Sequence, residues 1–131
     1  MTATDRGQRK NWFVTGAGRG LGRAITVAAL ERGDRVAASS RRLEDVADLS
    51  ECFCESLLPL GLDIRDRAAA APALAAARDR FGRVDILVNN AARSLGGAVD
   101  EVTEAEVRDL FYTNILGTIW VNQAALPIMR A

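Results

Sequence analysis

Histidine is absent from this sequence of 131 residues, and cysteine occurs only at Cys52 and Cys54. Without an imidazole, histidine-based catalytic triads and most histidine-ligated metal sites are excluded. Two cysteines this close together are too few for a disulfide framework or a zinc site. We therefore predict no metal site, and we expect reduced thiols in a cytoplasmic protein.

The sequence also lacks long apolar runs and an excess of either charge. No run approaches the ~20 residues of a transmembrane helix, and residues 1–10, predicted to be a flexible arm, do not resemble a signal peptide. Seventeen basic residues balance 17 acidic ones, so no membrane or nucleic-acid partner is expected. Basic side chains nevertheless gather in residues 1–42, where they serve either a local anion or only the solvated surface.

What the sequence does contain is a glycine-rich stretch at residues 11–22, Asn-Trp-Phe-Val-Thr-Gly-Ala-Gly-Arg-Gly-Leu-Gly. An apolar run precedes it and a helical pattern follows it, which predicts a strand, a phosphate-binding turn and a helix. Gly16, Gly20 and Gly22 would permit positive φ or close approach of a ligand or strand. The alternative is a glycine-rich hairpin or linker.

The remaining patterns predict alternating strands and helices in one domain, with 49% hydrophobic and 26% charged residues. The expected strands are 11–15, 35–39, 55–62 and the apolar run from Val84 to the asparagines at 89 and 90; the expected helices are 21–32, 43–52, 67–81 and 103–125. The continuous apolar run predicts a fourth strand buried on both faces. Pro59 suits an edge strand, and Pro127 is expected to end or kink the last helix.

Several side chains are assigned to particular places within these elements. The first helix is expected to bury Leu21, Ala24, Ile25, Ala28 and Ala29, with Gly33 as its left-handed C-cap. Either Asp63 or Asp66 would cap the alanine-rich helix 67–81, which Leu74 and Phe81 would anchor. Thr103 and Glu106 form a capping box at the start of the last helix.

The glycine spacing does not fit the common dinucleotide fingerprint G-x-G-x-x-G, and Gly22-Arg23-Ala24 does not fit an ATP phosphate loop. Thr15-Gly16-x-x-x-Gly20-x-Gly22 instead resembles the short-chain dehydrogenase/reductase family. Asn-Asn-Ala-Ala at residues 89–92 is similar to that family's Asn-Asn-Ala-Gly, and residues 111–117 resemble its helix asparagine motif. The resemblance implies an α/β fold of Rossmann type: a doubly wound parallel sheet, strand order 3-2-1-4, truncated before strand five, in a partial domain over residues 11–131.

The resemblance also implies a dinucleotide site. Its expected cofactor-binding residues are Thr15, Gly16, Gly18, Arg19, Gly20, Leu21, Gly22, Ser40, Arg41, Asp63, Ile64, Asn89, Asn90 and Ala91. In the family, basic residues at the places of Arg19 and Arg41 mark NADP(H) in preference to NAD(H), which agrees with the fit of a guanidinium to a 2′-phosphate. Both arginines could instead simply face solvent.

Other roles are implied by the resemblance alone. Asp63 and Ile64 stand where an Asp-Val pair meets the adenine ring, although Asp63 could instead be a helix cap. Asn89 and Asn90 would tie strands together and contact the cofactor ribose, or form a plain turn. Asn114 stands where the family's helix asparagine helps to hold a water of the proton relay; the alternative is an ordinary surface asparagine.

The family's chemistry also needs a serine and a Tyr-x-x-x-Lys pair, which this sequence does not supply. Tyr112 is its only tyrosine, with Leu116 four residues later, and Lys10 is its only lysine. We therefore expect the N-terminal portion of an oxidoreductase that moves a hydride between NADPH and a carbonyl or alcohol. Alone it is expected to be inactive, with strand four as an unpaired edge; the full-length form is expected to be a homo-oligomer. The alternative is a non-catalytic, regulatory NADP-binding module.

Overall fold

The computed structural model describes residues 7–131, and the predicted flexible arm falls largely on residues 1–6, outside that range. The last residues of the arm are held against the domain. Arg9 donates a hydrogen bond of 2.6 Å to the hydroxyl of Ser56, and the main-chain N–H of Lys10 donates one of 2.9 Å to Asp34.

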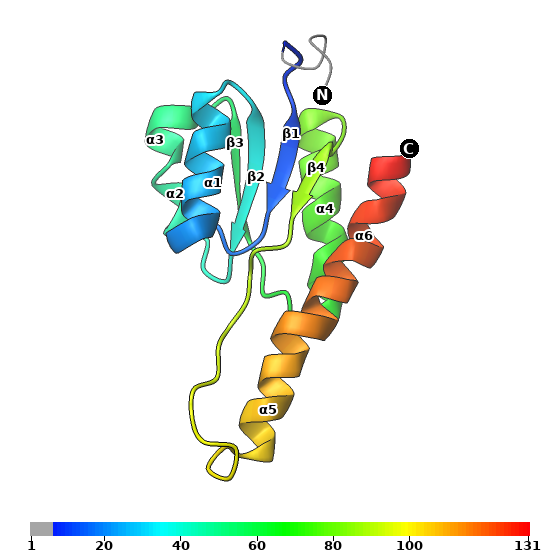
Figure 1. Ribbon diagram of the computed structural model, residues 1–131. Helices are drawn as coiled ribbons and strands as arrows, with labels where there is room; N and C mark the ends of the chain where they lie inside the picture. Colours follow the sequence, from blue (N-terminus) through cyan, green and yellow to red (C-terminus); the bar gives the residue numbers. More distant parts are fainter. Residues whose placement is uncertain (1–6) are drawn as a thin grey trace.

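Four parallel strands form one sheet in the order β3-β2-β1-β4 (Figure 1). The strands are β1 (Asn11–Val14), β2 (Arg35–Ser40), β3 (Leu57–Gly61) and β4 (Ile86–Val88). This confirms the predicted α/β fold and the strand order 3-2-1-4. Pro59 lies in the edge strand β3, opposite Ala38 of β2, as expected for a residue that has no N–H to donate.

Helices cover both faces of the sheet (Figure 1). One face carries α1 (Gly20–Glu31), α2 (Glu44–Ala47) and α3 (Ser50–Phe53); the other carries α4 (Arg67–Phe81) and α6 (Thr118–Arg130). Successive strand residues point to opposite faces, so Val14 belongs to the core under α1 whereas Phe13 belongs to the core under α4 and α6. The segment predicted as one helix, 43–52, is instead the two short helices α2 and α3; Val46 of α2 and Leu49, between the two helices, are buried.

The buried face of α1 differs from the predicted one. Ala29 is buried as predicted, but Leu21 is 70% exposed, Ala24 and Ala28 are exposed, and Ile25 is half-buried. The other buried residues of α1 are Gly22, Thr26 and Leu30. Gly22 faces the turn after β1, and α1 lies so close to the turn at this position that a Cβ would be 2.2 Å from the carbonyl oxygen of Gly16. Gly33 follows α1 with a φ of +93°, which confirms the predicted left-handed cap.

Helix α4 has the predicted bounds, and Leu74 and Phe81 are buried as expected. Its N-cap is Asp66, whose carboxylate accepts from the N–H of Ala68 at 3.0 Å. Asp63 is therefore not the cap of this helix.

Strand β4 is not buried on both faces, which contradicts the prediction from its apolar run. Ile86, Leu87 and Val88 are all half-buried. The physical reason is its position at the edge of the sheet, where only β1 pairs with it. The prediction that β4 forms an edge of the sheet is therefore correct for the described residues.

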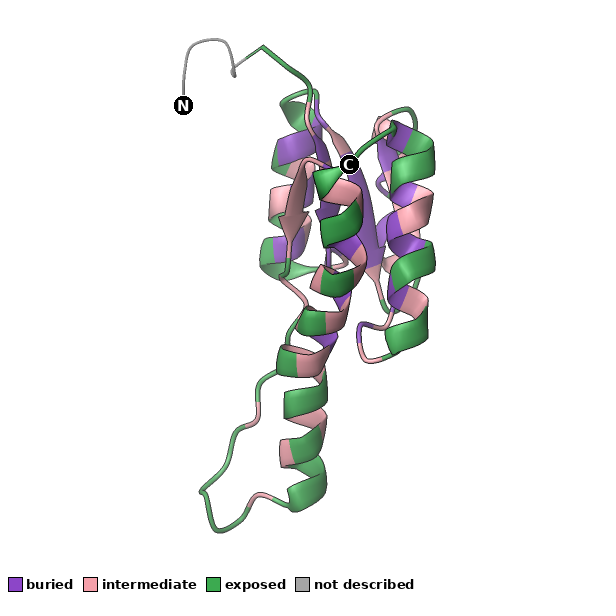
Figure 2. Ribbon diagram, turned by 90° about the vertical axis from the view of Figure 1, so that its right-hand side faces the viewer, coloured by how far each residue is buried: buried purple, intermediate pink, exposed green. Residues whose placement is uncertain are grey.

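The last predicted helix is three consecutive helical segments: α5 (Glu104–Phe111), a π-helical turn η2 (Tyr112–Gly117) and α6. The capping box of Thr103 and Glu106 is present at its start. Pro127 does not end the helix, which continues to Arg130. Segment 89–103 and α5 extend beyond the sheet, and Figure 2 shows mostly exposed residues there.

Asp34 is a buried carboxylate that links the chain before β1, at Lys10, to the end of α1, at Arg32, through hydrogen bonds and an ion pair. It accepts hydrogen bonds of 2.9 Å from the N–H of Lys10 and the indole N–H of Trp12, and it pairs with the guanidinium of Arg32. Although burial alone would raise the pKa of Asp34, the bonds from Lys10, Arg32 and Trp12 outweigh it and lower the pKa.

We predict that Asp34→Asn destabilises the fold by about 1.5–3 kcal/mol in urea unfolding, because bonds to a charged acceptor are lost. Because the pKa of Asp34 is lowered by folding, its carboxylate stabilises the fold fully above the unfolded pKa of ~3.9, and this stabilisation is lost as pH falls through the folded pKa. The difference in stability between Asp34→Asn and the unmodified protein should therefore shrink in acid. The control Asp79→Asn removes an exposed carboxylate that pairs with the adjacent Arg78 and should change stability by less than ~0.5 kcal/mol. Equal effects of both changes would contradict this prediction.

Candidate functional site

An open crevice of about 1030 Å³ lies at the carboxyl edge of the sheet, where the chain turns away from all four strands. In open parallel sheets, ligands bind at this edge, at the point where the strand order reverses, here between β1 and β4. We call this cavity the crevice. Its lining residues are Gly16, Gly18, Arg19, Gly20, Leu21, Ser40, Arg41, Arg42, Asp45, Leu62, Asp63, Ile64, Arg65, Asn90, Ala91, Ala92, Arg93, Ser94 and Thr113.

The glycine turn between β1 and α1 forms one wall of the crevice. Gly16 and Gly20 have positive φ, +65° and +56°, as predicted. Gly22 does not; it is needed for close approach, because a Cβ there would lie 2.2 Å from the carbonyl oxygen of Gly16 and 2.3 Å from Nδ2 of Asn90. The helix start at Arg19 has no side-chain cap and no acidic residue in its first turn. Its free N–H groups and positive dipole end are therefore suited to an anion.

Thr15 and Asn90 join the ends of β1 and β4. The hydroxyl oxygen of Thr15 accepts from the main-chain N–H groups of Asn90 and Ala91, at 3.1 and 3.0 Å. In return, Nδ2 of Asn90 donates to the carbonyl oxygens of Thr15 and Gly16, at 3.0 and 2.9 Å. Thr15 is thus a structural residue beneath the crevice and is not among its lining residues, whereas Asn90 also lines it.

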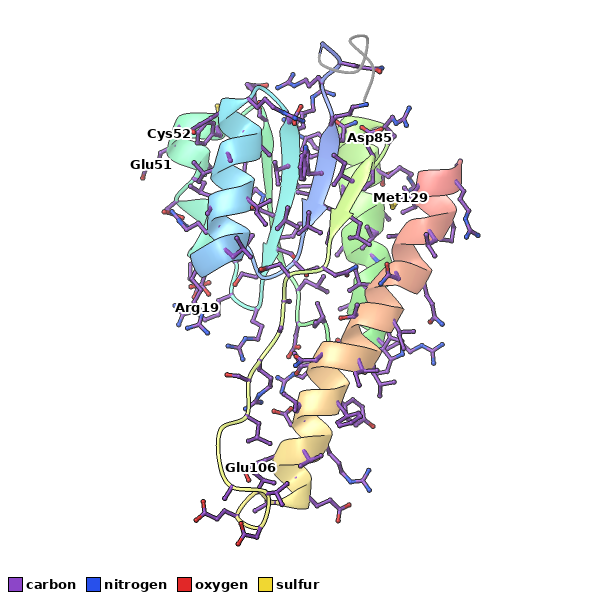
Figure 3. The ribbon with its side chains drawn as sticks, viewed as in Figure 1. Arg19, Glu51, Cys52, Asp85, Glu106 and Met129 are labelled. Carbon is purple, nitrogen blue, oxygen red and sulfur yellow. The ribbon has the colours of Figure 1, made fainter. Side chains whose placement is uncertain are left out.

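Basic side chains line the crevice beyond β1 and β2. Arg19 lies at the start of α1 at the carboxyl edge of the sheet (Figure 3), and Arg41 follows Ser40, the last residue of β2. Among the described residues no carboxylate forms an ion pair with Arg19 or Arg41. The nearby acid, Asp45, instead accepts from the Ser40 hydroxyl at 3.2 Å and lies 3.7 Å from Arg42.

The end of β3 brings Asp63 and Ile64 to the crevice. The guanidinium of Arg65 lies beside Asp63 (Nη2 to Oδ2, 2.8 Å), and hydrogen bonds from this side chain hold the pKa of Asp63 below its usual value. Burial opposes the shift, whereas the N–H of Arg65 and the positive charge of Arg41 favour it. Asp63 is therefore an anionic acceptor facing the crevice.

Besides Thr15, three predicted site residues do not line the crevice. Asn89 is exposed, and its Nδ2 donates to Oδ1 of Asn122 on α6 at 3.4 Å. Asn114 lies in η2, where its Oδ1 accepts from the N–H of Arg93 at 2.9 Å and its Nδ2 donates to the carbonyl of Arg93 at 2.8 Å. Both polar atoms of Asn114 therefore fix the main chain after β4. Gly22 is likewise beneath the crevice and not on its surface.

The only tyrosine and the only lysine lie far apart. Tyr112 is 46% exposed, with its ring centroid 6.1 Å from that of Trp120, and it does not line the crevice. Lys10 precedes β1, at the amino edge of the sheet, on the side where Figure 3 labels Asp85. No tyrosine–lysine pair is therefore assembled in the described part of the chain.

Some lining residues had no clear signal in the sequence. Arg42 could have been included because it adjoins Arg41, and Arg65 because it follows Asp63 and Ile64. Arg93 and Ser94 could have been included because they directly follow the motif at residues 89–92. Thr113 could not, because the fold brings it to the crevice from the helical segment η2.

The described residues contain no cluster of three or more cysteine, aspartate or glutamate side chains able to hold a metal ion. The helices of residues 7–131 include none with the length and apolar character of a membrane span.

Comparison with known proteins finds a matching family, similar sequences and similar structures. The family model described as short chain dehydrogenase matches residues 10–131. The chain is 37% identical over 122 residues to "Oxidoreductase BOA17" of Botryotinia fuckeliana, covering 92% of this chain and 44% of that protein. It is 36% identical over 120 residues to "NADP-dependent 3-hydroxy acid dehydrogenase YdfG" of Shigella flexneri, covering 89% and 48%.

A solved structure agrees with these matches. A short-chain dehydrogenase from Streptomyces avermitilis superposes with a TM-score of 0.89 at 42% identity, covering 94% of this chain and 45% of that one. The chain therefore spans somewhat less than half the length of each of these three proteins.

We predict that Thr15→Val, which keeps the shape but removes the hydroxyl, leaves two main-chain N–H groups without their acceptor. Each buried N–H group left without an acceptor lowers the free energy of unfolding by about 1–3 kcal/mol. The urea concentration at the unfolding midpoint should therefore fall, while the slope of the free energy of unfolding against urea concentration stays unchanged. The matched control is Thr26→Val, also fully buried, whose hydroxyl only donates to the Gly22 carbonyl within α1 and whose loss should cost about 1 kcal/mol or less. If the control were as destabilising as Thr15→Val, the hydrogen bonds that Thr15 makes between the ends of β1 and β4 would not have the stabilising role assigned to them.

Proposed function

The chain belongs to the short-chain dehydrogenase family, and from this premise we propose that its crevice binds NADP(H). In the full-length protein, this site would serve hydride transfer between NADPH and a carbonyl or alcohol. The bound cofactor would supply the hydride, and the residues described here would bind and orient it.

The observation that carries the NADP(H) assignment is the pair Arg19 and Arg41, which line the crevice and form no ion pair with a carboxylate among residues 7–131. A site for NAD(H) commonly has an acidic residue after the second strand, where it accepts hydrogen bonds from the ribose and repels a 2′-phosphate. Here Ser40 and Arg41 occupy this place, and Asp45 is engaged by Ser40 and Arg42. A guanidinium matches a phosphate dianion in geometry and charge. The NADP-dependence in the name of the Shigella relative agrees with this assignment.

The glycine turn suits the diphosphate of the same cofactor. Side chains at Gly16 and Gly18 would collide with neighbouring atoms at 2.8–2.9 Å, so main chain alone forms this part of the crevice. The uncapped start of α1 offers N–H groups to an anion. We assign the diphosphate to this wall and the adenine to the side of Asp63 and Ile64.

We further propose that residues 1–131, assayed alone, bind the cofactor without turnover. A positioned acid or base is needed to move the proton in this chemistry. The chain's only tyrosine is outside the crevice, its only lysine lies before β1, and Asn114 contributes positioning through Arg93. The gene beyond the codon for Ala131 tests the enzyme assignment: a serine followed by Tyr-x-x-x-Lys supports it, and the lack of such a remnant supports the regulatory module.

Two further assignments extend the proposal to the full-length protein. Its oligomerisation would cover the exposed apolar side chains of the last three helical segments, Phe111, Ile115, Ile119 and Leu126 among them. Its location would be the cytoplasm, where exposed free thiols such as Cys52 and Cys54 stay reduced.

We predict that Arg19→Ala and Arg41→Ala each weaken binding of 2′,5′-ADP by about tenfold or more, the effect of losing a charge-assisted bond. Binding of ADP, which lacks the 2′-phosphate, should change by no more than about twofold at Arg41→Ala. Calorimetric titration measures both ligands. The control Arg108→Ala removes an exposed arginine of α5 that pairs with Glu104 outside the crevice and should leave both affinities unchanged.

The unmodified chain should also bind NADPH more tightly than NADH. Equal affinity for the two cofactors, or tighter binding of NADH, would contradict the roles assigned to Arg19 and Arg41.

A further inference from the structure

Four charged side chains join three separate segments beside the crevice. Arg65 lies between two carboxylates: its Nη2 is 2.8 Å from Oδ2 of Asp63, and its Nη1 is 2.9 Å from Oδ1 of Asp109 on α5. The other oxygen of Asp109 pairs with the guanidinium of Arg93. We call Asp63, Arg65, Asp109 and Arg93 the charge bridge.

The charge bridge links opposite sides of the crevice. Asp63 and Arg65 line it after β3, and Arg93 lines it after β4. Asp109 is the carboxylate shared by the two arginines, and among the described residues it provides the ion-paired connection between them. The side chains are between 31% and 47% exposed, so their attraction is partly screened but not that of fully solvated charges.

Arg93 anchors the amino end of the segment 93–103, whose other end is held by the capping box of Thr103 and Glu106. Its guanidinium is held by Asp109, and its main chain by Asn114. Within the described residues, the hydrogen bonds of residues 94–102 are confined to the turn Ala98–Val102. A segment with so few fixed contacts opens at low free-energy cost, so the strength of its anchors decides how well it is ordered.

We propose that Asp109 is a positioning residue that couples occupancy of the adenine end of the crevice to the ordering of segment 93–103. The coupling rests on the proposed function, because its ligand is the adenosine half of NADP(H). Asp63 accepts from the main-chain N–H and the guanidinium of Arg65 at 2.8–3.2 Å. A ligand that contacts Asp63 changes how Arg65 is shared between Asp63 and Asp109, and thereby the hold of Asp109 on Arg93. By linkage, a change in the ordering of the segment must in turn change the affinity for the ligand by the same factor.

The bridge itself is tested without ligand by amide hydrogen exchange of residues 93–103, followed by mass spectrometry. Asp109→Asn should raise the exchange rate there roughly two- to fivefold, the range for loss of a partly exposed ion pair. Asp109→Glu should largely restore protection, because it keeps the carboxylate. The matched control, Glu104→Gln, removes another carboxylate–arginine pair of α5 and should leave these rates unchanged.

Salt provides a second readout that a purely packing role would not affect. Raising NaCl from about 0.05 M to about 0.5 M should accelerate exchange of residues 93–103 in the unmodified chain but not in Asp109→Asn, because only the former has the pair to screen. Unchanged exchange in Asp109→Asn, or equal salt sensitivity in both proteins, would overturn the anchoring role.

The coupling is tested by repeating the exchange with saturating 2′,5′-ADP. The ligand should change protection of residues 93–103 in the unmodified chain and in Glu104→Gln, and should lose at least half of this effect in Asp109→Asn and Arg65→Ala. Calorimetric titration with 2′,5′-ADP distinguishes failure of the coupling from failure of the proposed function. Binding without any effect on residues 93–103, or with the full effect in Asp109→Asn, overturns the coupling alone, whereas no binding by the unmodified chain overturns the proposed function and the coupling with it.

Discussion

The hydrogen bonds between Thr15 and Asn90 are the constraint on which the rest of the site depends. They join β1 to β4 where the two strands end, so the turn after one and the segment after the other leave the sheet at fixed positions. Gly22 then fits against this joint, where any side chain would collide with Gly16 and Asn90. The start of α1 is thereby held at the crevice with its N–H groups uncapped.

Charge is arranged around this rigid joint in two different ways. Arg19 and Arg41 lie in the crevice without ion-paired carboxylates among the described residues, which makes them suitable for a phosphate. Arg65 and Arg93 also line the crevice, but both are paired with Asp109. The first pair is thus suited to ligand recognition, and the second to holding the segments around the ligand.

The sequence was sufficient to predict the features that follow from local residue spacing or from the family resemblance. The glycine turn, the capping box at Thr103 and the strand order followed from spacing and from the family resemblance, and all are present. It failed where the decisive contact is distant: the buried face of α1 is set by Gly22 against Asn90, and the exposure of β4 by its place in the sheet. The pairing of Arg65 with Asp109 spans 44 residues and has no local signal.

The central claim is that the turn after β1 holds the diphosphate of a dinucleotide against the start of α1. The most direct measurement is a titration of the ¹⁵N-labelled chain with NADP⁺, followed by amide chemical shifts. We predict the largest shifts at residues 16–22, with further shifts at residues 40–42 and 63–65. Shifts confined to the amino edge of the sheet, around residues 9–10 and 83–85, or no saturable shifts at all, would contradict the account.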